Sequence, residues 1–532
     1  MAIRIFSASI QGIDAHLVEV EVDSTPGLHV LNIVGLPDKA VEESKDRIGA
    51  AIRNSGFTPP SGKNRRIVVN LAPADVKKEG PSYDLPIAIG YLLETSQIRF
   101  QSDEKLFAGE LSLDGSLKHT NGILAVALLS KKLGFKELII PAVNAQEAAV
   151  VDGLKIIGAR TIQEVIGHLN GTYVVPTPEP ISLITPTSNL ENSLLFIRGQ
   201  ESAKRGLIIA AAGGHNILMN GVPGSGKTLL AKALAELLPA LSLEEALEVA
   251  KIYSAVGLIK NTPLSFKRPF RSPHHTTSAV AVVGGGTYPR PGEVSLAHRG
   301  VLFLDELPEF PRMVLESLRQ PLEDGTVTIS RAAGSLQLPA KFTLIAAMNP
   351  CPCGNYGDEK ATCICSPLQI YRYTRKISGP LLDRIDIQIH VPRETYYGDS
   401  EGDIRGDIHG DSDTVTMNRN VTSNVTNVTM TDVTKIRGDI SNARMAQLQR
   451  FGANGIYTNA EITFKNIDKY CALSGPARQL LDQAAHAKNL SLRSYHKIQK
   501  LARTIADLEG AETIQQHHIA EAISLRIQEQ IV

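Results

Sequence analysis

Hydrophobic residues in the first part of the chain follow two different periods. Residues 67–71 (IVVNL) form a short apolar run, which predicts a buried strand. A second run opens at Pro37 and places Val41, Ile48 and Ile52 on one face of a helix. The mixture of short strands and helices predicts an α+β domain.

Three apolar runs in the middle of the chain each end at polar residues. Residues 216–220, 301–304 and 342–347 have the pattern of strands that are buried on both faces of a parallel sheet. Residues 229–238, which follow the first run, have a helical pattern. We therefore predict an α/β domain with a parallel sheet.

From residue 442 onward the pattern is helical. Ile498, Leu501, Ile505 and Leu508 recur at spacings of three, four and three residues, so they share one helical face. The C-terminal part of the chain is predicted to be a helical domain.

Two polar segments separate these regions. Residues 173–192 are rich in proline, which forbids a helix and predicts a semi-rigid linker. Residues 396–438 repeat the triplets GDI and NVT with almost no apolar periodicity, and they predict a low-complexity insertion. The domains are thus predicted at 1–172, 193–395 and 439–532.

The composition excludes several classes of protein. Lys+Arg and Asp+Glu are both 55 among 532 residues, so nucleic-acid binding would need a local patch or a ring of subunits. Aromatic residues are 5% and tryptophan is absent, which argues against broad base-stacking surfaces. There is no signal-like apolar start and no run near the roughly 20 apolar residues of a membrane helix. We expect a cytoplasmic protein with no membrane partner.

The first apolar run of the middle region leads into a phosphate-binding pattern. Residues 221–228 (GVPGSGKT) match G-x-x-x-x-G-K-[ST] between a strand and a helix. Backbone N–H groups of such a loop wrap phosphates, Lys227 would reach the β- and γ-phosphates of ATP, and Thr228 would hold Mg²⁺. The alternative is that residues 221–228 form only a glycine-rich turn before a helix and bind no phosphate. The expected ATP contacts are Gly221, Val222, Pro223, Gly224, Ser225, Gly226, Lys227, Thr228 and Asp305.

Candidate catalytic residues follow the later runs. Asp305 would complete the Mg²⁺ shell and Glu306 would act as general base, unless this strand simply ends at the surface. Asn349 would position water or the γ-phosphate. Arg384 is a candidate arginine finger, supplied in cis or by a neighbouring subunit, and a surface salt bridge is the alternative.

Longer strings around these residues resemble the ComM/YifB family of magnesium-chelatase-like AAA+ ATPases, over nearly the whole chain outside 396–438. The strings lie at residues 271–275, 284–286, 289–293, 295–298, 302–310, 349–354, 378–386 and 502–507. The resemblance implies a ring-forming motor, usually hexameric, in which Arg384 reaches the nucleotide of the next subunit. It also implies a helical lid whose sensor arginine is Arg493, with Arg503 as the alternative.

The same resemblance points to DNA as partner, through helicase or branch-migration activity in transformation or recombination. A chelatase-like or chaperone-like ATPase that remodels proteins is the alternative, because both share the same motor.

The N-terminal domain has a resemblance of its own. Residues 78–84, 107–111 and 133–141 resemble the protease domain of Lon, with Ser82 at the position of the nucleophile. The alignment places Leu124 where that family has its lysine, and a serine without its base is no nucleophile. The resemblance implies a Lon-protease-like fold without peptidase activity.

Residues 326–330 alternate between apolar and polar, and Gly334 suits a turn, so a β-hairpin is predicted with Arg331 near its tip. Arg331 would contact a DNA phosphate, or its side chain would be exposed to solvent at the tip of the hairpin without a partner.

His274 and His275 have no visible metal-ligand partner and are predicted to be structural or pore-loop residues.

Four of the five cysteines form the pattern C-x-C-x9-C-x-C. Four thiolates suit a structural, tetrahedral Zn²⁺ site, and free thiols or a redox pair are the alternatives. The candidate ligands are Cys351, Cys353, Cys363 and Cys365. Cys471 is predicted to be a core residue.

Overall fold

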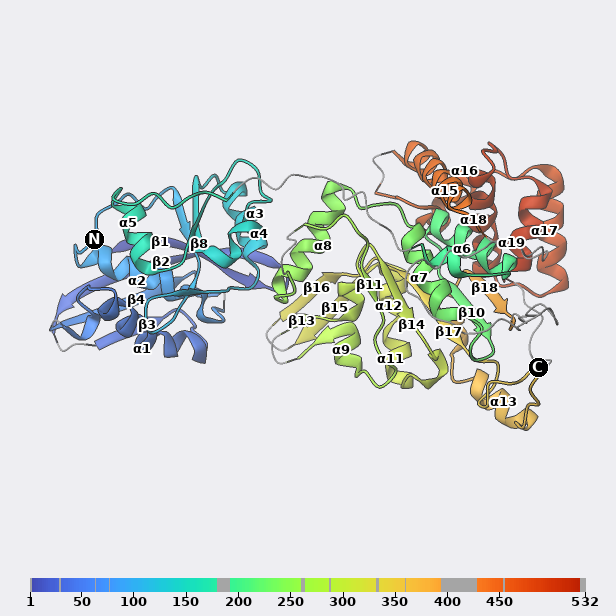
Figure 1. Cartoon of the computed structure of the whole chain (residues 1–532), viewed down its shortest axis with the longest axis horizontal. Helices are drawn as coiled ribbons and strands as arrows, with labels where there is room; N and C mark the ends of the chain where they lie inside the picture. The colour runs from blue at the N-terminus through green and yellow to red at the C-terminus, as the bar shows by residue number, and fades with distance from the viewer. Residues whose placement is uncertain are drawn as a thin grey trace, which may run out of the picture.

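The structure is a computed structural model of the chain, and Figure 1 shows three parts that follow one another along its longest axis. The described residues are 2–27, 30–62, 64–75, 77–178, 192–259, 264–286, 289–331, 334–358, 360–393, 428–452 and 455–526. Most of the predicted linker (179–191) and of the predicted insertion (396–427) lies outside them.

The N-terminal part is built on a seven-stranded mixed sheet of order β3-β4-β2-β1-β5-β8-β9. Strands β1 and β2 form an antiparallel hairpin, whereas β1, β5, β8 and β9 run parallel to one another. The strand predicted at 67–71 is confirmed as part of β4. The strands are β1 (Ile3–Gln11), β2 (Asp14–Pro26), β3 (Val30–Val34), β4 (Arg65–Ala72), β5 (Lys105–Phe107), β8 (Glu137–Pro141) and β9 (Lys155–Ala159), with a separate small pair β6 (Glu110–Leu111) and β7 (Leu117–Lys118).

The predicted N-terminal helix is α1 (Lys39–Asn54). It begins after Asp38, whose carboxylate accepts a hydrogen bond from the Val41 N–H at 2.9 Å, as an N-cap does. Its predicted apolar face is confirmed, because Val41, Ile48 and Ile52 are fully buried. The other helices of this part are α2 (Asp84–Glu94), α3 (Ile123–Lys132), α4 (Ala145–Ala148) and α5 (Ile162–Leu169).

The middle part contains the predicted parallel sheet, with five strands in the order β11-β14-β17-β10-β18. Every neighbouring pair is parallel, and β14 and β17 are buried along their whole length. Because the strands are parallel, residues that follow them gather at one edge of the sheet and residues that precede them gather at the other. The strands are β10 (Ile217–Gly221), β11 (Phe270–Arg271), β14 (Val301–Leu304), β17 (Thr343–Met348) and β18 (Ile387–Val391).

Helices cover both faces of this sheet, and a hairpin extends from it (Figure 1). The predicted hairpin is confirmed as β15 (Thr326–Arg331) and β16 (Gly334–Pro339), with Arg331 opposite Gly334 at the turn. A second, short pair is β12 (Gly284–Gly285) and β13 (Arg290–Pro291). The helices are α6 (Glu201–Gly213), α7 (Lys227–Leu237), α8 (Leu243–Ala255), α9 (Ala279–Val283), α10 (Glu293–Leu296), α11 (Arg312–Ser317), α12 (Arg319–Asp324), α13 (Pro367–Thr374) and α14 (Gly379–Leu382).

The C-terminal part is helical, as predicted, but it begins earlier than residue 439. Residues 430–438, predicted as low-complexity insertion, form the first turns of α15 (Met430–Phe451). Thr429 and Asp432 build a capping box that satisfies the free N–H groups at the start of this helix. The helix therefore starts directly after the last NVT triplet, where hydrophobic periodicity alone gave no signal. The remaining helices are α16 (Ile467–Tyr470), α17 (Gly475–Ala487), α18 (Leu492–Leu508) and α19 (Gln516–Arg526).

Shared contacts join the three parts. One face of the central sheet and helices α6 and α7 pack with the C-terminal helices in a single apolar core. Arg444 of α15 donates to the Ala211 carbonyl of α6 at 2.7 Å. On the other side, α3 packs on α8, and the Gly122 N–H donates to the Ser254 carbonyl at 3.0 Å. None of the helices within the described ranges combines the length and the hydropathy that a membrane crossing requires.

Candidate functional site

The phosphate-binding loop lies at the carboxyl edge of the central sheet, between β10 and α7. Gly224 and Gly226 have φ of 79° and 87°, a backbone conformation that favours glycine. A Cβ at Gly221 would lie 2.2 Å from the Val391 carbonyl oxygen, so only glycine fits there. The buried Ser225 Oγ has no hydrogen-bond partner among the described residues, which leaves it available to a ligand of the loop.

Lys227 is the first residue of α7 and points back over the loop. Its ammonium donates to the carbonyl oxygens of Gly221 at 2.7 Å and Val222 at 3.0 Å, and to Asn349 Oδ1 at 3.2 Å. Burial lowers the pKa of Lys227, and the nearby Asp305 and Glu306 carboxylates offset part of that shift. The structure thus brings the predicted phosphate lysine and the predicted asparagine together.

Thr228 and Asp305, the predicted Mg²⁺ ligands, lie next to each other. Thr228 Oγ1 lies 3.2 Å from Asp305 Oδ2, although the two residues are 77 positions apart. A hydroxyl and a carboxylate are oxygen donors of the kind that Mg²⁺ prefers. The donor set next to the loop therefore fits Mg²⁺.

Glu306 follows Asp305 with φ of 52°, in the left-handed region where non-glycine residues are uncommon. Its Oε2 lies 3.2 Å from His275 Nδ1, and its side chain is half exposed. The centre of the His275 ring lies 4.1 Å from that of the His274 ring, with the two rings tilted by 34°, and His275 lies edge-on to Phe310. His275, predicted to be a structural or pore-loop residue, thus contacts the predicted general base. The only signal was the family-like string at 271–275, which does not say what the histidine contacts.

Arg384 and Arg493 lie away from the P-loop of their own chain. Both pair with Glu323: Arg384 through Glu323 Oε2, and Arg493 Nη2 with Glu323 Oε1 at 2.7 Å. They line a cavity of about 650 Å³ between the sheet and the C-terminal helices. Arg503, the alternative sensor, is buried and donates to carbonyl oxygens of Ala511 and Glu512, which is a structural role.

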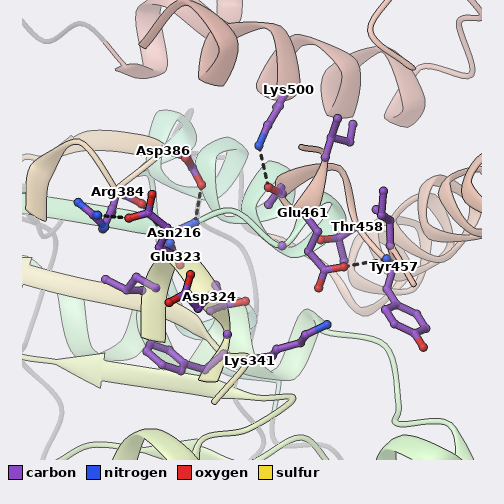
Figure 2. A pocket seen from close by; sticks show the side chains of 18 of the residues that line it. Asn216, Glu323, Asp324, Lys341, Arg384, Asp386, Tyr457, Thr458, Glu461 and Lys500 are labelled. Carbon is purple, nitrogen blue, oxygen red and sulfur yellow. Dashed lines mark hydrogen bonds and ion pairs between the residues drawn. The ribbon is translucent and has the colours of Figure 1, made fainter. Parts of the chain in front are cut away.

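The cavity opens at the amino edge of the sheet, opposite the P-loop. Residues that directly precede four strands line it: Asn216, Gly300, Phe342 and Asp386. Figure 2 shows Arg384, Glu323 and Asp386 on one side of the cavity and Tyr457, Glu461 and Lys500 on the other.

A buried ion pair joins the sheet to the C-terminal helices at this cavity. Asp386 Oδ1 lies 2.6 Å from the Lys497 ammonium, and Asp386 Oδ2 accepts from the Asn216 N–H at 3.1 Å. Burial alone would raise the pKa of Asp386, but Lys497 and His215 hold it well below its usual range. Burial lowers the pKa of Lys497 to about 8. The pair fixes the position of α18 on the core.

The four cysteines predicted as zinc ligands come together. Cys351 Sγ lies 3.4 Å from Cys353 Sγ and 3.7 Å from Cys363 Sγ, and all four sulfurs lie within 4.8 Å of one another. Ligands of a tetrahedral zinc with Zn–S near 2.3 Å stand about 3.8 Å apart, so the cluster fits this ion. Backbone N–H groups lower the pKa of Cys353 to about 6, which favours the thiolate that binds metal. Cys471 is buried in the C-terminal core, as predicted.

The cysteine loop rests on the phosphate-binding loop. A Cβ at Gly354 would lie 2.6 Å from Pro223 Cγ. Arg393 connects the same two loops, since it pairs with Asp358 at 3.3 Å and donates to the Pro223 carbonyl at 3.4 Å. The position of the cysteine loop is therefore linked to the shape of the phosphate-binding pattern at residues 221–228.

A second cluster contains residue types that can bind a metal: Glu509, His517 and His518. The Nε2 atoms of its histidines are instead engaged in hydrogen bonds. Both histidines place Nε2 3.0 Å from Glu509 Oε2. His518 Nδ1 accepts from the Gln515 N–H at 2.9 Å, so the neutral ring carries its proton on Nε2. That nitrogen is a donor to the carboxylate and not a free metal ligand.

The two residues matched to the Lon protease family lie in the N-terminal part. Ser82 lies in the short turn Pro81–Tyr83, and Leu124 is fully buried in α3. The Leu124 N–H donates to Glu147 Oε1 at 3.0 Å, and Glu147 also contacts Ser254 of α8. This region serves as the contact between the N-terminal and middle parts.

Three family profiles of magnesium chelatase match the chain. "Magnesium chelatase, subunit ChlI" matches residues 193–398, "Subunit ChlI of Mg-chelatase" matches 20–144, and "Magnesium chelatase, subunit ChlI C-terminal" matches 431–526.

Relatives also match over nearly the full length. The chain is 42% identical over 527 residues to the competence protein ComM of Haemophilus influenzae, covering 98% of this chain and 97% of that protein. It is 39% identical over 516 residues to YifB of Escherichia coli strain K12, covering 97% and 95%. A stretch of 166 residues is 28% identical to Lon protease 2 of Bacillus subtilis, which is 29% of each chain.

Proposed function

The chain belongs to the ComM/YifB family of magnesium-chelatase-like proteins, and on that premise we propose that it is an AAA+ ATPase that uses Mg²⁺. One observation carries the proposal: Lys227 reaches Asn349, and Thr228 reaches Asp305, at one edge of a parallel sheet. Three separate strands deliver these four side chains, which is the arrangement that phosphoryl transfer requires.

Each residue at the carboxyl edge has a role in this proposal. The loop amides and Lys227 bind the β- and γ-phosphates, while Thr228 and Asp305 hold Mg²⁺. Bound Mg²⁺ would neutralise charge that develops on the phosphate oxygens. Glu306 accepts a proton from the attacking water, and His275 fixes the direction of that carboxylate.

The motor is proposed to work as a ring, a homo-hexamer, in which Arg384 and Arg493 stabilise the transition state at the nucleotide of the next subunit. The position of both arginines at the opposite edge of the sheet supports this, because they do not approach the P-loop of their own chain. The four cysteines hold a structural Zn²⁺, and the N-terminal part is a Lon-like module without peptidase activity.

DNA is the proposed substrate, with helicase or branch-migration activity. The Haemophilus relative is named a competence protein, and the hairpin β15–β16 carries Arg331 at its turn. The second candidate is a chelatase-like or chaperone-like ATPase that remodels a partner protein, since the family profiles that match the chain are those of a magnesium chelatase subunit.

The test is ATPase activity measured with single-stranded, duplex and forked DNA at rising salt. We expect stimulation that falls steeply with salt, because phosphate contacts release counterions. Glu306→Gln serves as the control that binds ATP and does not turn it over. Absence of stimulation by all three DNAs would favour the protein-remodelling function.

A further inference from the structure

One acidic side chain connects the two arginines at the amino edge of the sheet. Glu323, in the last turn of α12, accepts from Arg493 Nη2 at 2.7 Å with Oε1 and pairs with Arg384 with Oε2. Arg384 follows α14, whereas Arg493 lies in the first turn of α18 in the C-terminal part. Glu323 therefore joins two arginines from different domains into one cluster.

We propose that Glu323 is a positioning residue, which holds Arg384 and Arg493 as a pair directed at the phosphates of the neighbouring subunit's nucleotide. This inference rests on the ring mechanism proposed above. One carboxylate between two guanidinium groups reduces their mutual repulsion and still leaves an excess positive charge. Without the carboxylate, the two cations would repel each other and move apart.

The contacts of Arg384 support a fixed position. Its Nε donates to the Arg319 carbonyl at 3.1 Å and its Nη1 to the Pro380 carbonyl at 2.7 Å, and only 12% of its side chain is exposed. Because a guanidinium has five N–H donors, these bonds and the bond to Glu323 leave one donor on each terminal nitrogen for an incoming phosphate. Glu323 can thus orient Arg384 without being displaced.

The element that carries Glu323 is itself held in place. Helix α12 ends at Asp324, and its C-cap Gly325, with φ of 65°, leads directly into β15. Gln320 on the same helix lies 3.4 Å from Thr328 Oγ1 of that strand. The Glu323 carboxylate is therefore placed by a short, anchored helix and not by a free loop.

The first test is steady-state ATPase kinetics of Glu323→Gln, with Asp324→Asn as matched control. Asp324 neighbours Glu323 on α12 and lines the same cavity. For Glu323→Gln we expect kcat to fall about 10- to 100-fold, the cost of misplacing a catalytic group by about 1 Å. KM for ATP should stay near wild type, since the P-loop is untouched. An unchanged kcat would overturn the proposal.

The second test mixes subunits, which distinguishes the two halves of a shared site. Lys227→Ala subunits mixed with Arg384→Ala subunits should regain ATPase activity, because some interfaces combine an intact P-loop with an intact arginine. Lys227→Ala mixed with Glu323→Gln should regain activity in the same way. Arg384→Ala mixed with Glu323→Gln should not, since both defects lie in the same half.

The mixtures test the trans arrangement of Arg384 and the role of Glu323 separately. No recovery in the Lys227→Ala and Arg384→Ala mixture would overturn the trans arrangement, and this inference with it. Recovery there, combined with no recovery for Lys227→Ala and Glu323→Gln, would overturn only the role of Glu323. Recovery of activity in the Arg384→Ala and Glu323→Gln mixture would also overturn the role of Glu323 and leave the trans arrangement in place.

Discussion

The two edges of the central sheet both present charged groups, but they are built differently. At the carboxyl edge, Thr228, Asp305 and Asn349 each follow a strand closely, so the sheet itself brings them together. At the amino edge, Glu323 and Arg493 come from helices of different domains that meet only through packing. The arrangement at the carboxyl edge therefore depends on the order of the strands. The arrangement at the amino edge depends on how the C-terminal helices pack on the core.

The largest expected effects come from one substitution at each edge. Lys227→Ala should weaken nucleotide binding about 100-fold, because it removes a charged hydrogen-bond donor. Arg384→Ala should leave nucleotide binding near wild type and lower turnover about 1,000-fold, the range of an arginine finger. Titration with a fluorescent nucleotide and steady-state ATPase assays measure the two effects. Lys232→Ala, an exposed position on α7, is the control. Loss of nucleotide binding in Arg384→Ala would contradict the division between the edges.

A second prediction concerns the attachment of the C-terminal helices at the amino edge. Asp386→Asn should lower the free energy of unfolding by about 3–5 kcal/mol, because it leaves Lys497 buried without its partner. The pKa of Asp386 is lower in the folded chain than in the unfolded one, so its contribution is present above about pH 4 and is lost as the pH falls.

Urea unfolding followed by circular dichroism, at pH 7 and below pH 4, measures this effect. The difference between the wild type and Asp386→Asn should shrink at the lower pH. Asp383→Asn, at the same cavity, is the control. An equal difference at both pH values would mean that the carboxylate charge is not what holds the helices.

A third prediction concerns the cysteine loop at the carboxyl edge. Cys363→Ser should reduce bound zinc from about one ion per chain to near zero, because three thiolates hold the ion weakly. Nucleotide affinity should fall only a few-fold, since the cysteine loop contacts the phosphate-binding loop at Pro223 and supplies none of the predicted phosphate or Mg²⁺ ligands. Metal analysis and nucleotide titration test this, with Cys471→Ala as control. Full zinc content in Cys363→Ser would remove Cys363 from the site.

The smallest effect is expected from residues 397–426. Replacing them by a short Gly/Ser linker should change ATP turnover by less than about two-fold, because their repeated polar sequence has almost no apolar periodicity and changes in the length of a loop cost little free energy. Thr429 is retained because it caps α15. A large loss of turnover in the ATPase assay would show that this segment contributes to one of the two edges.

Much of the fold was predictable from the sequence alone. The strands at 67–71, 216–220, 301–304 and 342–347, the helix at Val41–Ile52 and the hairpin at Arg331 all have local patterns. So do the residues of the phosphate-binding loop, because a loop that wraps phosphates needs glycines and a lysine within a few positions. The start of α15 was missed because a capping box, and not an apolar period, sets it.

Which distant side chains meet depends on the tertiary structure. His275 faces Glu306, and Glu323 joins Arg384 to Arg493, although nothing in their local sequences indicates these pairs. Local sequence determines elements because periodicity, caps and glycines act over a few residues. Contacts between domains depend instead on the packing of whole helices on the sheet, and this packing places a carboxylate 170 residues away from its arginine within hydrogen-bond reach.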